Sequence, residues 1–338
     1  MMSNNPLKSG LRVVGIKLNN RCPLRCRHCS VGFSNEYRGN NYRISADELR
    51  DIIAAIDPRI YTMVSFSGGE PSLEPSLLRV GIDACKAKGL SSVIVTAPIW
   101  AANPSAADQF LDSVRGLDHL VMSYDRYHLE FLKVAHYETA ARAAASRGIF
   151  ASFHITYSAE AELAELKDKI ARVWHLGGES SMRTIPVGNA ANAGNVKMEL
   201  ISIGSIGDLA RIPRGCLLGN VLVDETRSVY GCCWSCGVQR SPFSVSKQPG
   251  GWAATMKQLE ENVLFQTVRA SGFIDALTPK GQEALVRLVK GRGFANECHL
   301  CLTAMQEGGA EIWDECIREK HPPGRQTLRE PNSLMAGE

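Results

Sequence analysis

LRVVGIKLNNRCPLRCRHC, residues 11–29, joins a β-branched run to three closely spaced cysteines. The run predicts a strand at 11–18, and Cys22, Cys26 and Cys29 follow it with C-x3-C-x2-C spacing. Three thiolates hold three corners of a 4Fe-4S cube and leave one iron open, which a small molecule can chelate through an amine and a carboxylate. A structural zinc site is the alternative, and it needs a fourth protein ligand.

Composition narrows the class of protein. The chain has 338 residues, 44% hydrophobic content and eleven cysteines, an odd number that favours reduced thiols over a disulfide framework. No apolar run approaches the roughly 20 residues that cross a bilayer, and the N-terminus has neither a signal peptide nor an Arg-rich leader. A net charge of +3 is too small to indicate a nucleic-acid or membrane partner. We therefore expect a cytoplasmic protein without such partners.

Short β-rich runs alternate with helical patterns over the first 200 residues. Strands are predicted at 11–18, 62–68, 91–97, 119–125, 150–158 and 181–187. Ser45 and Glu48 predict a capping box, and Gly89 and Gly148 stand where helices end. Alternation with right-handed crossovers predicts an α/β fold, a partial (β/α)6 TIM-like barrel with reactive groups at the carboxyl ends of its strands.

A second motif, SGGEP at residues 67–71, follows the second predicted strand. Two glycines allow the backbone to approach a ligand closely, although such a segment is also an ordinary strand-to-helix turn. Together the motifs resemble the radical S-adenosylmethionine (SAM) superfamily, whose 4Fe-4S cluster cleaves SAM to a 5'-deoxyadenosyl radical and whose GGEP-like segment contacts the methionyl amine. The resemblance implies cluster ligands Cys22, Cys26 and Cys29, and SAM contacts from Gly68, Gly69, Glu70 and Pro71.

The same resemblance assigns later strand ends to SAM or to the substrate. Its implied contacts are Ser123, Asp125, Thr156, and the Ile185 and Val187 backbone beside the adenine. Each is also compatible with an ordinary polar strand end. Arg183 is expected either to reach a carboxylate in the barrel mouth or to pair with an acidic neighbour, and His28 to pack over the cluster. The third strand ends in VTAPIW, where many relatives are more polar.

After residue 200 the pattern changes to a hairpin with cysteines on both sides. It resembles the SPASM/twitch extension, whose opening pattern Cys216, Gly231 and Cys236 satisfy, whereas Cys232 would place Arg227 in the glycine position. The resemblance implies one auxiliary 4Fe-4S cluster within a domain at 201–320, held by Cys216, Cys236, Cys298 and Cys301. A zinc ribbon is the alternative. Residues 321–338 are predicted to be a disordered tail.

Other thiols are left over by these assignments. A weak S–H bond can return hydrogen to a carbon radical, so Cys233 is the candidate catalytic residue, with packing as its alternative. Cys85 and Cys316 are predicted to pack in cores.

The implied function is a radical SAM enzyme of the oxidoreductase or epimerase type, served by a reducing partner such as flavodoxin or ferredoxin. Relatives with such extensions mostly cross-link or epimerise ribosomally synthesised peptides, which makes a peptide the first expected substrate. Dehydrogenation or epimerisation of a small molecule, such as an aminoglycoside or a sugar, is the alternative. It fits a barrel that starts near residue 11 and leaves no room for a leader-binding module in front. A third class, a non-catalytic iron-sulfur or zinc scaffold protein, is disfavoured because it would give the GGEP segment no role.

Overall fold

The computed structural model describes residues 12–30, 42–171, 177–191, 196–214, 220–224, 226–232, 241–307 and 312–313. Several predicted positions lie outside these ranges: Cys216, Cys233, Cys236, Cys316 and the tail 321–338. Their assignments stay predictions.

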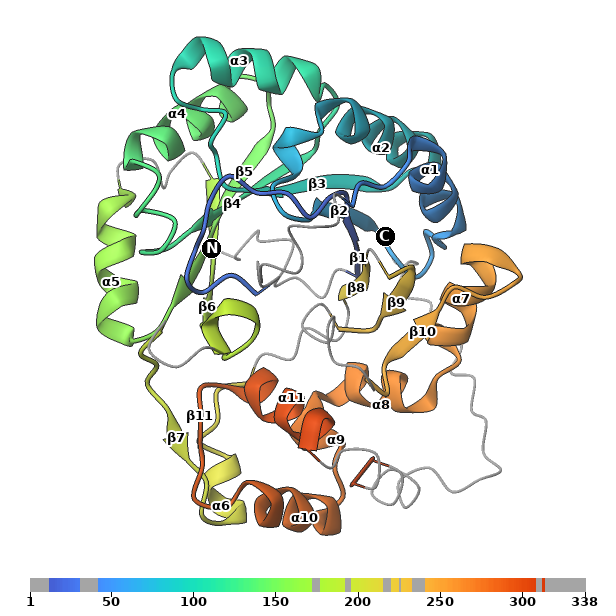
Figure 1. Cartoon of the computed structure of the whole chain (residues 1–338), viewed down its shortest axis with the longest axis vertical. Helices are drawn as coiled ribbons and strands as arrows, with labels where there is room; N and C mark the ends of the chain where they lie inside the picture. Colours follow the sequence, from blue (N-terminus) through green and yellow to red (C-terminus); the bar gives the residue numbers. More distant parts are fainter. Residues whose placement is uncertain are drawn as a thin grey trace, which may run out of the picture.

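Six parallel strands, β1 to β6, form the barrel sheet in the order of the sequence. Their bounds are β1 (Val13–Lys17), β2 (Met63–Ser67), β3 (Ser91–Thr96), β4 (His119–Tyr124), β5 (Phe150–Tyr157) and β6 (Gly177–Arg183). Helices follow the first five strands: α1 (Ala46–Ala55), α2 (Pro75–Lys88), α3 (Pro104–Ser113), α4 (Val134–Ala145) and α5 (Glu160–Lys169). Figure 1 shows these helices around the outside of the curved sheet. The predicted partial TIM-like barrel is confirmed.

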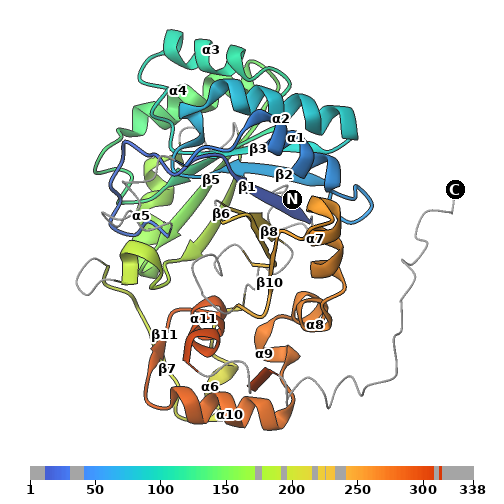
Figure 2. The ribbon, with the colours of Figure 1, turned by 45° about the vertical axis from the view of Figure 1, so that its right-hand side comes forward.

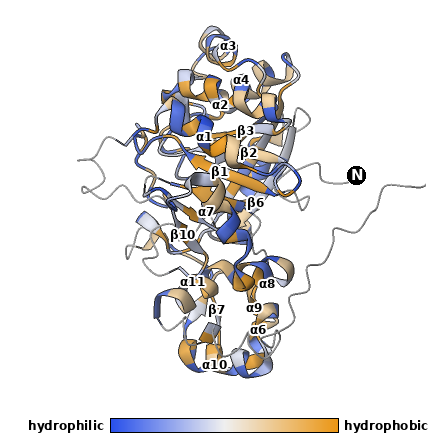
Figure 3. Ribbon diagram, turned by 90° about the vertical axis from the view of Figure 1, so that its right-hand side faces the viewer, coloured by the Kyte–Doolittle hydropathy of each residue, from blue (hydrophilic) through white to orange (hydrophobic). Residues whose placement is uncertain are grey.

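Local signals explain where the helices begin and end. The Oγ of Ser45 accepts a hydrogen bond from the backbone N–H of Glu48 at 3.1 Å, which caps α1. The Glu48 carboxylate instead forms an ion pair with Arg227 at 3.2 Å. Gly89 ends α2 with a φ of 72°, and Gly148, with a φ of 69°, follows the end of α4. Hydrophobic and hydrophilic residues are mixed along these helices (Figure 3), as amphipathic elements require.

The sixth strand differs from its prediction at 181–187, because it starts and ends four residues earlier. A Cβ at Gly177 would lie 1.9 Å from the carbonyl oxygen of Ala151, so this strand can pair closely with β5 only through a glycine. Pro186 has no N–H to donate to a ladder, and the strand ends before it. The sequence pattern misses this start because glycines are weak strand formers.

The predicted hairpin is found as β8 (Asn220–Val223) and β9 (Ser228–Tyr230), and β10 (Ser244–Ser246) pairs with β9. Beyond the prediction, β8 also pairs in parallel with β1, so it extends the barrel sheet on the side away from β2.

Of the remaining elements, the helix after β10 packs against α1 beside the barrel, and the others lie below the barrel in the view of Figure 2. The remaining elements are β7 (Ile201–Ser202), α6 (Ile206–Leu209), α7 (Gly251–Glu260), α8 (Val263–Ser271), α9 (Phe273–Ala276), α10 (Pro279–Val289), β11 (Gly293–Phe294) and α11 (Glu297–Glu307). Two short 3-10 helices follow barrel strands in sequence: η1 (Pro71–Leu73) comes after β2, and η3 (Gly188–Ala191) comes after β6. Among the described residues, no helix has the length and apolar character to span a membrane.

Side chains alternate between two faces of the barrel sheet. On β1, Val14 and Ile16 pack in the main core with the helices, whereas Val13 points into the barrel. There it joins one side chain from each of the next three strands in a separate apolar cluster, which we call the lumen floor: Val13, Met63, Val93 and Val121. Apolar packing therefore covers the inner face of β1 to β4 toward the amino ends of these strands.

Candidate functional site

A cavity of about 290 Å³ lies at the carboxyl ends of the barrel strands, and every strand from β1 to β6 contributes a lining residue. Val95 of β3 lines this cavity and also packs against the lumen floor, which places the cavity directly above the floor. Cys22, Cys26 and Cys29 all line it. The fold thus brings the predicted cluster ligands to the end of the barrel where barrel enzymes carry out their chemistry.

The backbone of the cysteine loop is fixed by short hydrogen bonds. The N–H of Cys29 donates to the carbonyl of Cys26 at 3.2 Å, which makes a turn between these two ligands. Asn189 donates from its side chain to the Cys26 carbonyl at 3.2 Å and from its backbone to the Cys29 carbonyl at 2.9 Å. Its neighbour Gly188 has a φ of 55° and lies against the Cys29 carbonyl, where a Cβ would come within 2.4 Å. The 3-10 helix after β6 therefore holds the loop in place.

The chemistry of these thiols fits an iron-sulfur cluster. Burial raises the pKa of the Cys22 thiol to about 12, and the charges of Glu70, Cys29 and Cys26 act in the same direction. Cys26 is buried and Cys22 and Cys29 are half-buried. Three such sulfurs within electrostatic reach of one another are unfavourable as bare thiolates and favourable around iron cations. This donor set, three thiols at one cavity wall, can hold a 4Fe-4S cluster with one open iron.

The Gly68–Glu70 loop packs on the start of the cysteine loop. The N–H of Gly69 donates to the carbonyl of Asn19 at 2.8 Å, and that of Glu70 to the carbonyl of Arg21 at 2.7 Å. A Cβ at Gly69 would lie 2.1 Å from the Arg21 oxygen, and Gly68 has a φ of 145° that disfavours any side chain. The close approach that these glycines permit is thus to the protein's own backbone, in addition to the ligand approach expected from the sequence.

The Glu70 carboxylate ties the same loop to β3. It accepts hydrogen bonds from the Thr96 hydroxyl at 2.5 Å, the Ala97 N–H at 2.9 Å and the Ser72 N–H at 3.0 Å. Burial raises the pKa of Glu70, although the hydrogen bonds from Ser72 and Thr96 oppose that rise. Glu70 is therefore a positioning residue for the loop that lines the cavity.

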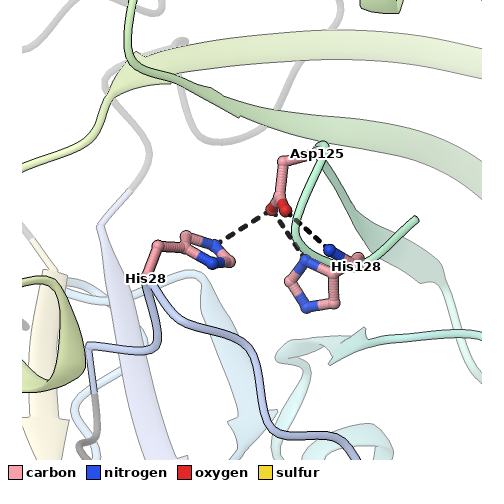
Figure 4. A group of neighbouring side chains, drawn as sticks. All are labelled: His28, Asp125 and His128. Atoms are coloured by element: carbon pink, nitrogen blue, oxygen red, sulfur yellow. Dashed lines mark hydrogen bonds and ion pairs between the residues drawn. The ribbon is translucent and has the colours of Figure 1, made fainter. Parts of the chain in front are cut away.

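His28, Asp125 and His128 form a group at the cavity that we call the His–Asp–His triad, in which Asp125 is buried and the histidines are half-buried (Figure 4). One carboxylate oxygen, Oδ2 of Asp125, lies 3.0 Å from Nε2 of His28 and 2.7 Å from Nδ1 of His128. The other oxygen accepts the backbone N–H groups of Tyr127 and His128, each at 2.9 Å. The donor atoms of the three side chains lie within 4.8 Å of one another, close enough for a metal ion, yet direct hydrogen bonds already account for the two short contacts.

The electrostatics of the triad favour a charged pair. Burial alone would raise the pKa of Asp125, but the charge and hydrogen bonds of His128 and His28 hold it well below its usual range. Burial disfavours a charged His128, but Asp125 and then the Cys26 thiol outweigh that effect and raise the pKa of His128 well above its usual value. Because His128 is within hydrogen-bonding reach of Cys26, the triad links the cysteine loop to the end of β4.

The His28 ring is held flat against Tyr127, with 4.6 Å between ring centroids and 19° between planes. Its Nδ1 is buried and has no hydrogen-bond partner among the residues that the structure describes. A bound molecule at this wall can satisfy that nitrogen, since unpaired buried polar atoms are costly. Besides the predicted packing at the cluster, His28 can therefore form a hydrogen bond with a bound molecule through its Nδ1.

The structure brings most of the other predicted residues to the same cavity. Its walls include Ser123, Asp125, Thr156, Arg183 and Ile185, whereas Val187 and Pro71 are not among the lining residues. Arg183 forms an ion pair with its acidic neighbour Glu160 at 2.8 Å and also lines the cavity. Its other expected role, contact with a carboxylate in the barrel mouth, stays a prediction. At the end of β3, Thr96 of the VTAPIW stretch lines the cavity, and its hydroxyl donates to Glu70.

Among the basic residues that line the cavity, three were missed by the sequence reasoning: Lys17, His128 and His154. Alternation gives a signal for Lys17 and His154, since each stands between apolar residues that face the helices. His128 follows β4 in a short turn, and nothing in its local sequence distinguishes it.

The described part of the auxiliary region contains Cys298 and Cys301. They lie about one helical turn apart near the start of α11, and both are buried. Arg214, two residues before Cys216 in sequence, lies 3.7 Å from the Glu297 carboxylate at the start of that helix. Cys232 is buried in the same hydrophobic core.

A sequence model described as the Radical SAM superfamily matches residues 16–157, the part of the chain that holds both motifs, the end of β1 and strands β2 to β5. Residues 16–157 therefore form a domain of the radical SAM superfamily. Membership implies a 4Fe-4S cluster and SAM, which the donor set described above fits.

Several solved structures are similar at low identity. Methylornithine synthase (PylB) has 15% identity and a TM-score of 0.41, over 53% of this chain and 56% of that one. BtrN, in complex with AdoMet and 2-DOIA, has 14% identity and a TM-score of 0.39, over 78% and 88%. HydG, a maturase of the [FeFe]-hydrogenase, has 12% identity and a TM-score of 0.40, over 95% and 84%. The chain spans about half the length of the methylornithine synthase that it matches.

Proposed function

We propose that this protein cleaves SAM reductively and uses the resulting 5'-deoxyadenosyl radical to abstract hydrogen from a carbon of a substrate held in the barrel. The observation that carries the proposal is the meeting of three cysteine thiols and the Gly68–Glu70 loop at one cavity above an apolar floor. When bound, the cluster supplies one electron to SAM and the organic radical chemistry that follows.

The residues of the chain have distinct tasks in this proposal. Cys22, Cys26 and Cys29 hold the cluster, and the backbone of Gly68 to Glu70 lies beside it to receive SAM. The His–Asp–His triad fixes the cysteine loop on β4, and its unpaired nitrogen faces a bound molecule. The lumen floor gives the cavity an apolar base below β1 to β4, which limits the access of water from that side and protects a carbon radical.

For the substrate, we propose the small-molecule class. The support is the cavity itself, which has a volume of about 290 Å³, lies above an apolar floor and is lined by polar side chains from several strands. Among the described residues, no contact specifically favours a ribosomally synthesised peptide, and that expectation stays a prediction.

We also propose the auxiliary cluster at Cys216, Cys236, Cys298 and Cys301. Its support is the pair of buried cysteines one turn apart on α11, beside a segment that leads to Cys216 in sequence. Such a cluster can accept the electron of a substrate radical, which corresponds to dehydrogenation. Epimerisation by Cys233 is the competing outcome, and a flavodoxin or ferredoxin remains the proposed reductant.

Electron paramagnetic resonance tests SAM binding without turnover. We expect SAM to change the spectrum of the reduced, reconstituted protein, because its amine and carboxylate complete the coordination of one iron. Gly68→Ala should weaken this response, whereas Cys85→Ala, a thiol buried in the main core, should leave it intact. A spectrum that does not respond to SAM at any concentration contradicts the proposal.

A further inference from the structure

The cysteine loop carries several exposed arginines. Arg21 directly precedes Cys22 in sequence, and Arg25 and Arg27 flank Cys26. All three arginines are exposed, although the cysteines beside them are buried or half-buried. The segment that holds the proposed cluster ligands therefore presents positive charge to solvent.

A fourth arginine reaches the same surface from the turn after β4. The guanidinium carbons of Arg27 and Arg126 lie 5.6 Å and 5.2 Å from the centroid of the Tyr127 ring. The Tyr127 ring also stacks on His28, which stands inside the cysteine loop. These contacts place the exposed Arg126 beside the loop, although it is far away in sequence.

A fifth arginine, Arg43, lies near the start of the loop. Arg21 and Arg43 donate to the Glu74 carboxylate at 2.8 Å and 2.6 Å, and this carboxylate is buried while both arginines are exposed. The arginines on the β4 side pair with Glu130, which is exposed, and with Glu162, which is half-buried. Five exposed arginines thus stand against three carboxylates, of which one is exposed, so the surface is positively charged.

Two large apolar side chains are exposed next to these groups. Leu73 directly precedes Glu74, and Phe131 directly follows Glu130; they are 39% and 44% exposed. Single exposed apolar residues are ordinary, but aromatic residues together with arginine are the composition that is enriched where proteins bind one another. We call the five arginines with Leu73 and Phe131 the arginine face.

We propose that the arginine face docks the electron donor of this protein, a small acidic protein with a flavin or an iron-sulfur cluster as its one-electron carrier. The inference rests on the proposed function, because reductive cleavage of SAM requires a reduced cluster. One electron passes to the enzyme's cluster, while a flavin hydroquinone becomes a semiquinone or a reduced donor cluster becomes oxidised, and no bond forms or breaks.

Charge and position both support this partner. Electron transfer between proteins slows steeply with distance, so a donor must dock near the loop that holds the cluster ligands, and the arginine face lies on that loop. Opposite charge on the partner speeds the encounter and fixes its orientation. Exposed apolar side chains within the charged surface add contact area that water must leave on docking.

Calorimetric titration of the reconstituted holoenzyme measures docking, and freeze-quench electron paramagnetic resonance measures the rate of cluster reduction. The acidic probes are a flavodoxin and a 2Fe-2S ferredoxin, and cytochrome c is the basic redox protein with which they are compared. Photoreduced 5-deazariboflavin is an uncharged small reductant that needs no docking surface.

The variants are the double substitution Arg25→Gln with Arg126→Gln, and the single substitution Phe131→Ala. Arg287→Gln on α10 and Val263→Ala on α8 are the matched controls, since both residues are exposed and lie outside the arginine face. Iron content confirms that each variant is folded and loaded.

We expect at least one acidic donor to bind the wild type, and cytochrome c to bind far more weakly. Binding should weaken about tenfold or more between about 0.01 M and about 1 M ionic strength, because the Debye length shrinks from about 30 Å to about 3 Å. The double variant should lose about tenfold in affinity and in the rate of reduction by the donor. Phe131→Ala should lose about threefold in affinity. The controls should match the wild type, and 5-deazariboflavin should reduce every variant at the same rate.

Three results would overturn the inference: neither acidic donor binds the wild type, cytochrome c binds as tightly as the acidic donors, or the double variant keeps its affinity. Formation of 5'-deoxyadenosine in the same samples separates the two proposals. If the acidic donor binds and reduces the cluster but neither reductant yields 5'-deoxyadenosine, the proposed function fails and the docking surface stands. If 5-deazariboflavin yields it while no acidic donor binds, the proposed function stands and the docking surface fails.

Discussion

His28 and Asp125 are joined across the barrel mouth, with 3.0 Å between Nε2 of the histidine and Oδ2 of the carboxylate. His28 lies between two cluster ligands, and Asp125 directly follows β4, so this contact ties the cysteine loop to a strand about a hundred residues away in sequence. Since Asp125 also holds His128, one buried carboxylate organises this wall of the site.

Asp125→Asn tests that role. The amide keeps the size of the side chain but removes the negative charge that both histidines contact. Breaking such a buried ion pair costs about 3 kcal/mol. We expect the free energy of unfolding in urea to fall by that amount and the iron content to fall with it. Asp83→Asn, at an exposed ion pair with Arg79 on α2, should change stability by less than about 0.5 kcal/mol. Equal effects of the two substitutions would contradict the account.

Gly69→Ala tests the packing of the two loops. Because the added methyl group would lie 2.1 Å from the Arg21 carbonyl, the Gly68–Glu70 loop and the start of the cysteine loop must move apart. We expect the iron bound after reconstitution to fall by at least half. Gly89→Ala is the matched control: its φ of 72° makes it cost about 1 kcal/mol, but no atom lies within 4 Å of its added Cβ. It should keep its iron, and iron loss in both variants would refute the packing argument.

Acid stability depends on Glu260 at the end of α7. Burial would raise its pKa, but hydrogen bonds from Arg269 and Tyr61 outweigh that and lower the pKa below the usual value of 4.5. A depressed folded-state pKa contributes stability that is present above 4.5 and is lost as the pH falls through the folded value. We expect Glu260→Gln to be less stable than the wild type at neutral pH, with a difference that shrinks below pH 4.5. Urea unfolding at several pH values measures it, and a constant difference would be inconsistent with this sign.

Cys298→Ala with Cys301→Ala tests the auxiliary cluster. Loss of two thiolates from a four-thiolate site should reduce the iron from about eight to about four per chain. SAM cleavage by the first cluster should persist. Cys85→Ala controls for the loss of a buried thiol and should keep all of the iron. Zinc in place of the second set of irons would favour the zinc ribbon.

The sequence predicted the parts of the site that depend on short spacing. The cysteine triplet and the SGGEP segment each lie within a few residues, so their chemistry can be read locally. His128 was missed because its role arises from contacts with Asp125 and Cys26 that only the folded barrel creates. Lys17 stood inside the quoted strand, where its inward direction follows from alternation but its burial does not.

Two fold features were also beyond the pattern. The sixth strand begins at Gly177 because its backbone must approach Ala151, a tertiary requirement that overrides strand propensity. The parallel pairing of β8 with β1 joins segments about two hundred residues apart, and no local signal specifies it.

The most direct test of the central claim is a dithionite-driven assay for 5'-deoxyadenosine after anaerobic reconstitution. The wild type and Cys85→Ala should form it from SAM, whereas the variant with Cys22, Cys26 and Cys29 all changed to Ala should not, while still holding about four irons in the proposed auxiliary cluster. 5'-Deoxyadenosine formation that persists in the triple variant would contradict the assignment of these three cysteines.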